Sequence, residues 1–96
     1  MTQQYLAGEL SVLLGELQAA APNQASARDL AGLRHQAETG PLNVLGAVTV
    51  RALALADDLC WDLLTRADAV GFTRQAALSA QLHVFGVCAG LLPEEK

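Results

Sequence analysis

A chain of 96 residues with six basic and ten acidic side chains carries a formal net charge of -4 at pH 7. This charge argues against nucleic-acid binding, which depends on clustered lysine and arginine. Hydrophobic residues make up 52% of the sequence, more than one small domain can hide, because its surface-to-volume ratio is high. We therefore expect a single domain, residues 1–96, that forms a homodimer.

The sequence also predicts where the protein resides. Residues 1–10 lack the basic start and continuous apolar segment of a signal peptide. No apolar run reaches the ~18 residues that span a bilayer, since Arg51, Asp57 and Asp58 interrupt the best candidate. We expect a cytoplasmic protein with no membrane partner. The absence of isoleucine and the single lysine are typical of a high-GC bacterial genome.

The first helix is expected over residues 2–21, between Thr2 as N-cap and Pro22, which disfavours a helical residue before it. One apolar stripe recurs at helical spacing along it: Leu6, Leu10, Leu13, Leu14 and Leu17. A second line of small residues follows the same helix: Gly8, Ser11 and Gly15. It either lets another helix backbone approach closely or has no packing role, in which case the helix merely tolerates the two glycines.

A shorter helix is expected over residues 26–39. Ser26 and Asp29 resemble a capping box, and Gly40 with Pro41 is a stop signal. Arg34 and Glu38 are spaced for an i,i+4 ion pair. The apolar stripe of this helix is narrow: Leu30, Leu33 and Ala37.

The longest helix is expected over residues 42–70. Projection at about 100° per residue places one set of residues on a core face: Leu45, Thr49, Ala52, Ala56, Leu59, Leu63 and Val70. Asp62 and Arg66 are spaced for an ion pair on the solvated side. A second apolar stripe points away from the core face: Val50, Leu53, Ala54, Trp61 and Leu64.

The fourth helix is expected over residues 73–92, after a tight reversal in which Gly71 caps the preceding helix and Thr73 is the N-cap. Its expected apolar face is Leu78, Leu82, Phe85, Cys88, Ala89 and Leu92, and its expected polar line is Gln75, Ser79, His83, Gly86 and Gly90. The predicted fold class is all-α, a four-helix bundle-like domain. A long central third helix pairs with the fourth in an antiparallel hairpin.

Few residues are suited to chemistry. The soft and imidazole ligands are Cys60, Cys88, His35 and His83, and their spacings match no zinc pattern. Cys60 and His83 are conceivable as a nucleophile and its base, but a small apolar role for both cysteines is the simpler interpretation. We expect no catalytic residues, no metal and no cofactor, and two reduced thiols.

Two other motifs are weak. Asp58 and Asp62 share a helix face, but the Glu-x-x-His pattern of carboxylate bundle sites is missing, so we interpret them as part of a solvated acidic face. Residues 30–53 have the layout of a helix-turn-helix, yet Asn43 is almost the only donor that the second helix offers to bases.

The leading functional prediction is a non-enzymatic protein-protein interaction or regulatory module that self-associates. Its interface is predicted at Val50, Leu53, Trp61 and Leu64, because tryptophan is enriched at interfaces; burial of Trp61 within the chain is the alternative. A second hypothesis is a small-molecule-binding protein or small helical enzyme with a pocket near Trp61, Asp57 and His83. A third is a transcription-associated factor whose dimer pools Arg28, Arg34, Arg51 and Arg74.

Overall fold

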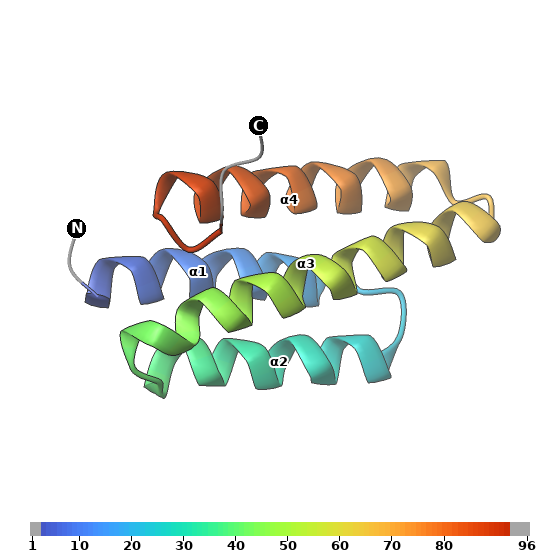
Figure 1. Ribbon diagram of the computed structural model, residues 1–96. Coiled ribbons are helices and arrows are strands. Elements are labelled where there is room, and N and C mark those ends of the chain that lie inside the picture. Colours follow the sequence, from blue (N-terminus) through green and yellow to red (C-terminus); the bar gives the residue numbers. More distant parts are fainter. Residues whose placement is uncertain (1–2, 93–96) are drawn as a thin grey trace.

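A computed structural model describes residues 3–92, which form four helices and no strand (Figure 1). They are α1 (Gln3–Ala19), α2 (Gln24–Thr39), α3 (Leu42–Thr65) and α4 (Ala69–Cys88). The all-helical prediction is confirmed, and α3 is the longest helix. The proposed cap at Thr2 lies outside the described residues.

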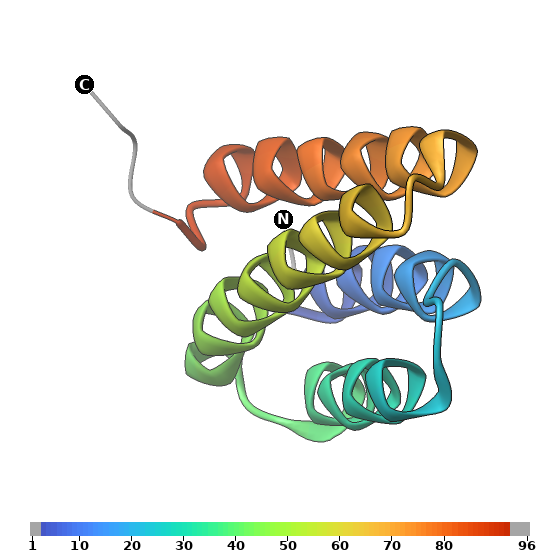
Figure 2. The ribbon, with the colours of Figure 1, turned by 90° about the vertical axis from the view of Figure 1, so that its right-hand side faces the viewer.

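The third helix occupies the centre of the arrangement. It contacts each of the other three helices, whereas α2 and α4 do not contact each other within the described residues. Figure 1 shows α3 running obliquely between α4 and α2, with α1 behind it, and Figure 2 shows α4 and α2 at opposite edges. The extents of the fold, 40 × 32 × 16 Å, describe a slab roughly two helix layers thick.

The core forms where the apolar stripes of the helices meet. The stripe predicted for α1 is buried at Leu6, Leu10, Leu14 and Leu17, and Leu13 is partly buried against the same cluster. The predicted core face of α3 is also confirmed: Leu45, Thr49, Ala52, Ala56, Leu59 and Leu63 are all at most 4% exposed. Val70 does not belong to that face, because it lies in α4 and is 82% exposed.

The prediction that α3 continues to Val70 is wrong. The helix ends at Thr65, and Ala67 adopts a left-handed conformation with φ of 58°. Asp68 then caps α4 by accepting a hydrogen bond from the Gly71 amide at 2.9 Å. Gly71 is therefore in the first turn of α4, where a Cβ atom would lie 2.6 Å from the Asp68 carboxylate. Thr73 is not the cap, although the predicted tight hairpin exists.

The other helix ends also differ by a few residues. Helix α1 ends at Ala19 instead of residue 21, and Asn23 is the cap of α2, accepting a hydrogen bond from the Ser26 amide at 2.8 Å. Ser26 is thus inside the first turn and is not itself the cap. Helix α4 ends at Cys88 instead of residue 92, because Gly90 has φ of 75° and residues 91 and 92 donate hydrogen bonds back to the Gly86 carbonyl.

The predicted line of small residues on α1 meets the side chain of Arg34 on α2. The Arg34 Nε atom donates a hydrogen bond of 3.1 Å to Ser11 Oγ and forms the predicted ion pair with Glu38 at 3.4 Å. A Cβ atom at Gly15 would lie 3.4 Å from the Arg34 guanidinium, whereas Gly8 faces open space. Close approach at Ser11 and Gly15 therefore serves the packing of α1 against α2.

The predicted faces of α4 are confirmed in part. Leu78, Phe85 and Ala89 pack against the core as expected, and His83 and Gly90 are exposed as expected. Gln75 and Gly86 were expected on the polar line but are buried, and Cys88 was expected on the apolar face but is exposed. Leu82 is fully buried as expected. The side chain of Gln75 is completely buried, and neither Nε2 nor Oε1 has a hydrogen-bond partner in the described part of the chain.

Candidate interaction surface on α3 and α4

The side of α3 that faces away from α1 carries the residues predicted to form an interface. Val50, Trp61 and Leu64 are 52%, 63% and 52% exposed, so burial of Trp61 within its own chain is excluded. Leu53 is half-buried and packs against the core. Whether another molecule covers these side chains is untested, and the interface stays a prediction.

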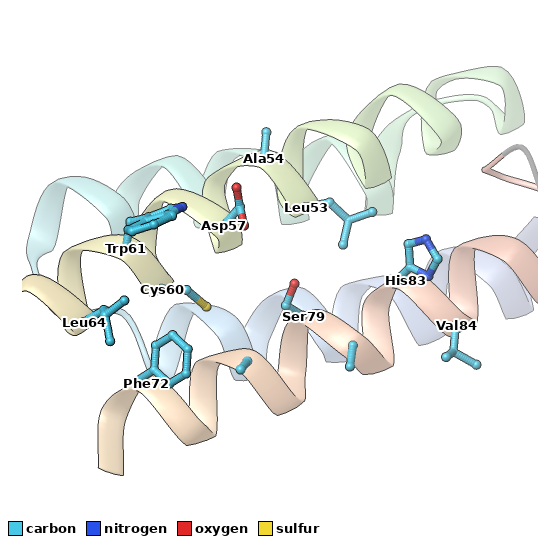
Figure 3. Close-up of a pocket in the computed structure, with 12 residues that line it drawn as sticks. Leu53, Ala54, Asp57, Cys60, Trp61, Leu64, Phe72, Ser79, His83 and Val84 are labelled. Atoms are coloured by element: carbon cyan, nitrogen blue, oxygen red, sulfur yellow. The ribbon is translucent and has the colours of Figure 1, made fainter. Parts of the chain in front are cut away.

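Trp61 and Leu64 line an open groove of about 850 Å³ between α3 and α4. Figure 3 shows Trp61, Leu64 and Cys60 on one wall and Phe72 and Val84 on the other. Between Phe72 and Val84, three small side chains of α4 line the groove: Ala76, Ser79 and Ala80. The result is a mostly apolar surface that is accessible along its length.

Three polar side chains line the same groove: Asp57, Ser79 and His83. Burial, and secondarily the negative charge of Asp57, raise the pKa of the Cys60 thiol above its ordinary value. No hydrogen bond joins Cys60 to His83 within residues 3–92, and Figure 3 shows His83 across from Leu53, further along α4. Because a reactive cysteine needs a stabilised thiolate, this arrangement does not activate Cys60 as a nucleophile.

A second, more polar groove of about 520 Å³ lies between α3 and α2. Charged side chains of both signs line it: Arg28, Asp29, Arg51 and Asp58. Arg51 and Asp58 are exposed, and neither makes an ion pair within the described residues. Ala54 lines both grooves, so α3 stands as a ridge between them.

The structure brings together only some of the residues on which the metal and nucleic-acid hypotheses depend. Arg28 and Arg51 line one groove, but two carboxylates, Asp29 and Asp58, line it with them. No group of three metal-ligating side chains comes together in the part of the chain that is described. Asp62 forms the predicted ion pair with Arg66, at 3.3 Å, and this interaction partners its otherwise unbonded Oδ2 atom. Arg34 is held by Ser11 and Glu38 between α1 and α2, away from Arg51.

A search of the described helices for a segment that is long and apolar enough to cross a membrane finds none.

Phe72 and Val84, which α4 supplies to the wall of the groove, were not predicted from the sequence. Phe72 was interpreted as an anchor before the helix, and Val84 was not considered. A signal was nevertheless present, because four apolar residues recur at every fourth position: Phe72, Ala76, Ala80 and Val84. The register error at the start of α4 hid this line, since Phe72 was placed outside the helix.

Comparison with models of known protein families, with curated proteins and with solved protein structures finds no match to this chain.

Proposed function

We propose that this protein is a non-enzymatic interaction module that forms a homodimer through the outward surface of α3 and α4. The observation that supports the proposal is the concentration of exposed apolar side chains there: Val50, Trp61, Leu64 and Val84 are each 52% to 63% exposed. A group of exposed apolar side chains marks an interaction site more often than single, scattered ones do.

Burial of the exposed part of Trp61 would contribute substantially to the free energy of dimerisation. The exposed part of Trp61 leaves on the order of 150 Å² to be buried, which stabilises a complex by about 4 kcal/mol at 25 cal/mol per Å². Association costs roughly 4–15 kcal/mol in lost rotational and translational freedom. A homodimer buries Trp61 of both copies, which contributes about 8 kcal/mol in total. This gain lies within the cost of association, so the neighbouring Leu64 and Val84 side chains must contribute the remainder.

A second copy fits the shape of the chain. The fold is only 16 Å thick in its shortest direction but 40 and 32 Å in the others. Stacking two slabs on the α3 side, with about 5 Å between the nearest backbones, gives a thickness of roughly 37 Å. The dimer is then close to isometric, which lowers its surface per residue.

Light scattering at micromolar concentration tests the proposal. Wild type is expected to be a dimer, and Trp61→Ala is expected to shift the population to monomer. Val84→Lys and Val12→Lys form a matched pair, because the two valines are 60% and 59% exposed but only Val84 lines the groove. Only Val84→Lys should weaken association; a monomeric wild type, or equal effects of the two lysines, contradicts the proposal.

The volume of the α3–α4 groove supports a second candidate, the binding of a small apolar molecule. A cavity of about 850 Å³ lies within the range of known ligand sites, and Trp61 provides a fluorescent reporter. Screening a metabolite library for quenching of Trp61 tests this candidate. Silence across the library, together with a stable dimer, favours the interaction module.

A further inference from the structure

The ridge of α3 carries a charge pattern that the apolar groove does not explain. Arg51, Ala54 and Asp58 are exposed along it, and neither charge has an ion-pair partner within the described residues. Arg51 and Asp58 line the α2 side of the ridge, whereas Asp57 lines the α4 side. The two sides are therefore chemically different.

We propose that the second copy packs its α3 antiparallel against this one, across a two-fold axis at Ala54, so that Arg51 meets the partner subunit's Asp58 twice. This inference rests on the homodimer proposed above and adds its geometry. The occupant of the ridge is a second copy of this chain because a single sequence supplies both members of each ion pair.

The register follows from the spacing of the charges around Ala54. Arg51 lies three residues before Ala54 and Asp58 four residues after it, which places them roughly 4.5 and 6 Å from the axis along the helix. A two-fold axis that is perpendicular to α3 and lies in the plane of the interface places the α2 side of one ridge against the α2 side of the other. Arg51 then faces the partner subunit's Asp58 on the α2 side, and the reverse pair forms by symmetry.

The parallel arrangement is disfavoured by the same charges. A two-fold axis along α3 exchanges the sides of the ridge, so Asp58 would face the partner subunit's Asp57. Two carboxylate–carboxylate contacts would then form across the interface, and Arg51 would have no carboxylate opposite it. Both effects cost free energy at an interface. Charge complementarity thus selects the antiparallel pairing.

Side-chain size agrees with the antiparallel register. Ala47 lies seven residues before Ala54 and Trp61 seven residues after it, and all three are exposed. The large indole of Trp61 therefore lies over the partner subunit's Ala47, about 10 Å from the axis. With alanine at the axis, the two helices can approach to about 8 Å.

Mixing two charge-reversed variants tests the inference. Arg51→Glu and Asp58→Arg should each weaken self-association roughly 10- to 100-fold, because every homodimer then contains two like-charge contacts. An equimolar mixture should form the heterodimer, in which both contacts are again of opposite sign. Native mass spectrometry measures the heterodimer fraction directly, and circular dichroism checks that each variant is folded.

The control pair is Glu9→Arg with Arg74→Glu, which makes the same charge changes at exposed positions of α1 and α4 that line neither groove. Its mixture should form no more than the statistical share of heterodimer. If wild type is dimeric but the Arg51→Glu and Asp58→Arg mixture also shows only the statistical share, this geometry is wrong and the homodimer stands. If wild type is monomeric, both proposals fail.

A cross-link locates the axis independently. With Cys60 and Cys88 replaced by serine, Ala54→Cys should form an intermolecular disulfide under mild oxidation, because equivalent residues at a two-fold axis approach each other closely. Ala47→Cys in the same background should not, since equivalent residues there lie roughly 20 Å apart along the helices. The opposite result overturns the register.

Discussion

The buried amide of Gln75 makes the sharpest test of the fold. Its side chain is completely buried on α4, and neither amide atom has a hydrogen-bond partner among the described residues. Burying an unsatisfied polar group costs about 1–3 kcal/mol. Gln75→Met keeps a similar volume without an amide to desolvate, so we expect the free energy of unfolding to increase by about 1–3 kcal/mol.

The expected shift is large enough to measure by thermal denaturation. At about 2.1 cal/mol/K per residue, a chain of this length has an unfolding entropy of roughly 0.2 kcal/mol/K, so Tm should rise by roughly 5–15 °C. Urea denaturation followed by circular dichroism gives the free energy directly. Protein concentration must be held constant, because dimerisation makes Tm concentration-dependent.

Gln81→Met is the matched control, because Gln81 is exposed on the same helix. Its effect should stay within about 0.5 kcal/mol. If Gln75→Met unfolds at a lower temperature than wild type, the amide is bonded to an ordered water molecule in solution, and the assignment of an unsatisfied group is refuted.

Three further predictions concern the α3–α4 turn and the thiols. Asp68→Ala should lower the free energy of unfolding by about 1 kcal/mol in urea denaturation, because the Gly71 amide loses its cap; no change would contradict the cap. Ala67→Gly should raise it by about 1 kcal/mol, because glycine relieves the left-handed strain, and a loss would show that the turn is different. Iodoacetamide should modify exposed Cys88 faster than Cys60, whose burial raises the pKa of its thiol; the rate at Cys60 should still be rising above pH 9, and faster modification of Cys60 at pH 7 would contradict its burial.

Helical periodicity was enough to predict the class of fold and most of the core. The leucines of α1 and the inner face of α3 are buried as predicted, because both stripes recur at the spacing of a helix. The ion pairs Arg34–Glu38 and Asp62–Arg66 also follow from local spacing alone.

The break between α3 and α4 could not be predicted from the same pattern. Residues 65–70 contain no proline or glycine, and apolar residues continue through them at helical spacing. The structure ends α3 at an alanine in the left-handed region, which a sequence rule assigns to glycine. Tertiary packing of α4 against α3 and α1 offsets the local strain, and propensity does not include that term.

The positions of α4 that were assigned to the wrong face have a related cause. Alanines and small residues occur on several sides of this helix, so many choices of apolar face look similar in projection. The side that packs is decided by the fit to α1 and α3, which buries Gln75 and Gly86 and leaves Val84 exposed. A sequence without a strongly polar stripe gives no signal that could assign Gln75, Gly86 and Cys88 to the correct face.

The central position of α3 makes its outward side informative. A helix about 10 Å wide can contact up to six neighbours of equal width, and α3 contacts three within the described residues. Three neighbours leave part of its circumference uncovered, so some exposure of α3 follows from the number of helices in the chain. The number of helices does not determine which residues are exposed. Val50, Trp61 and Leu64 are exposed there beside the charged Arg51, Asp57 and Asp58. Because intrachain packing requires none of the three apolar side chains, they support a partner on that side more strongly than an equal number of exposed apolar residues scattered over the surface.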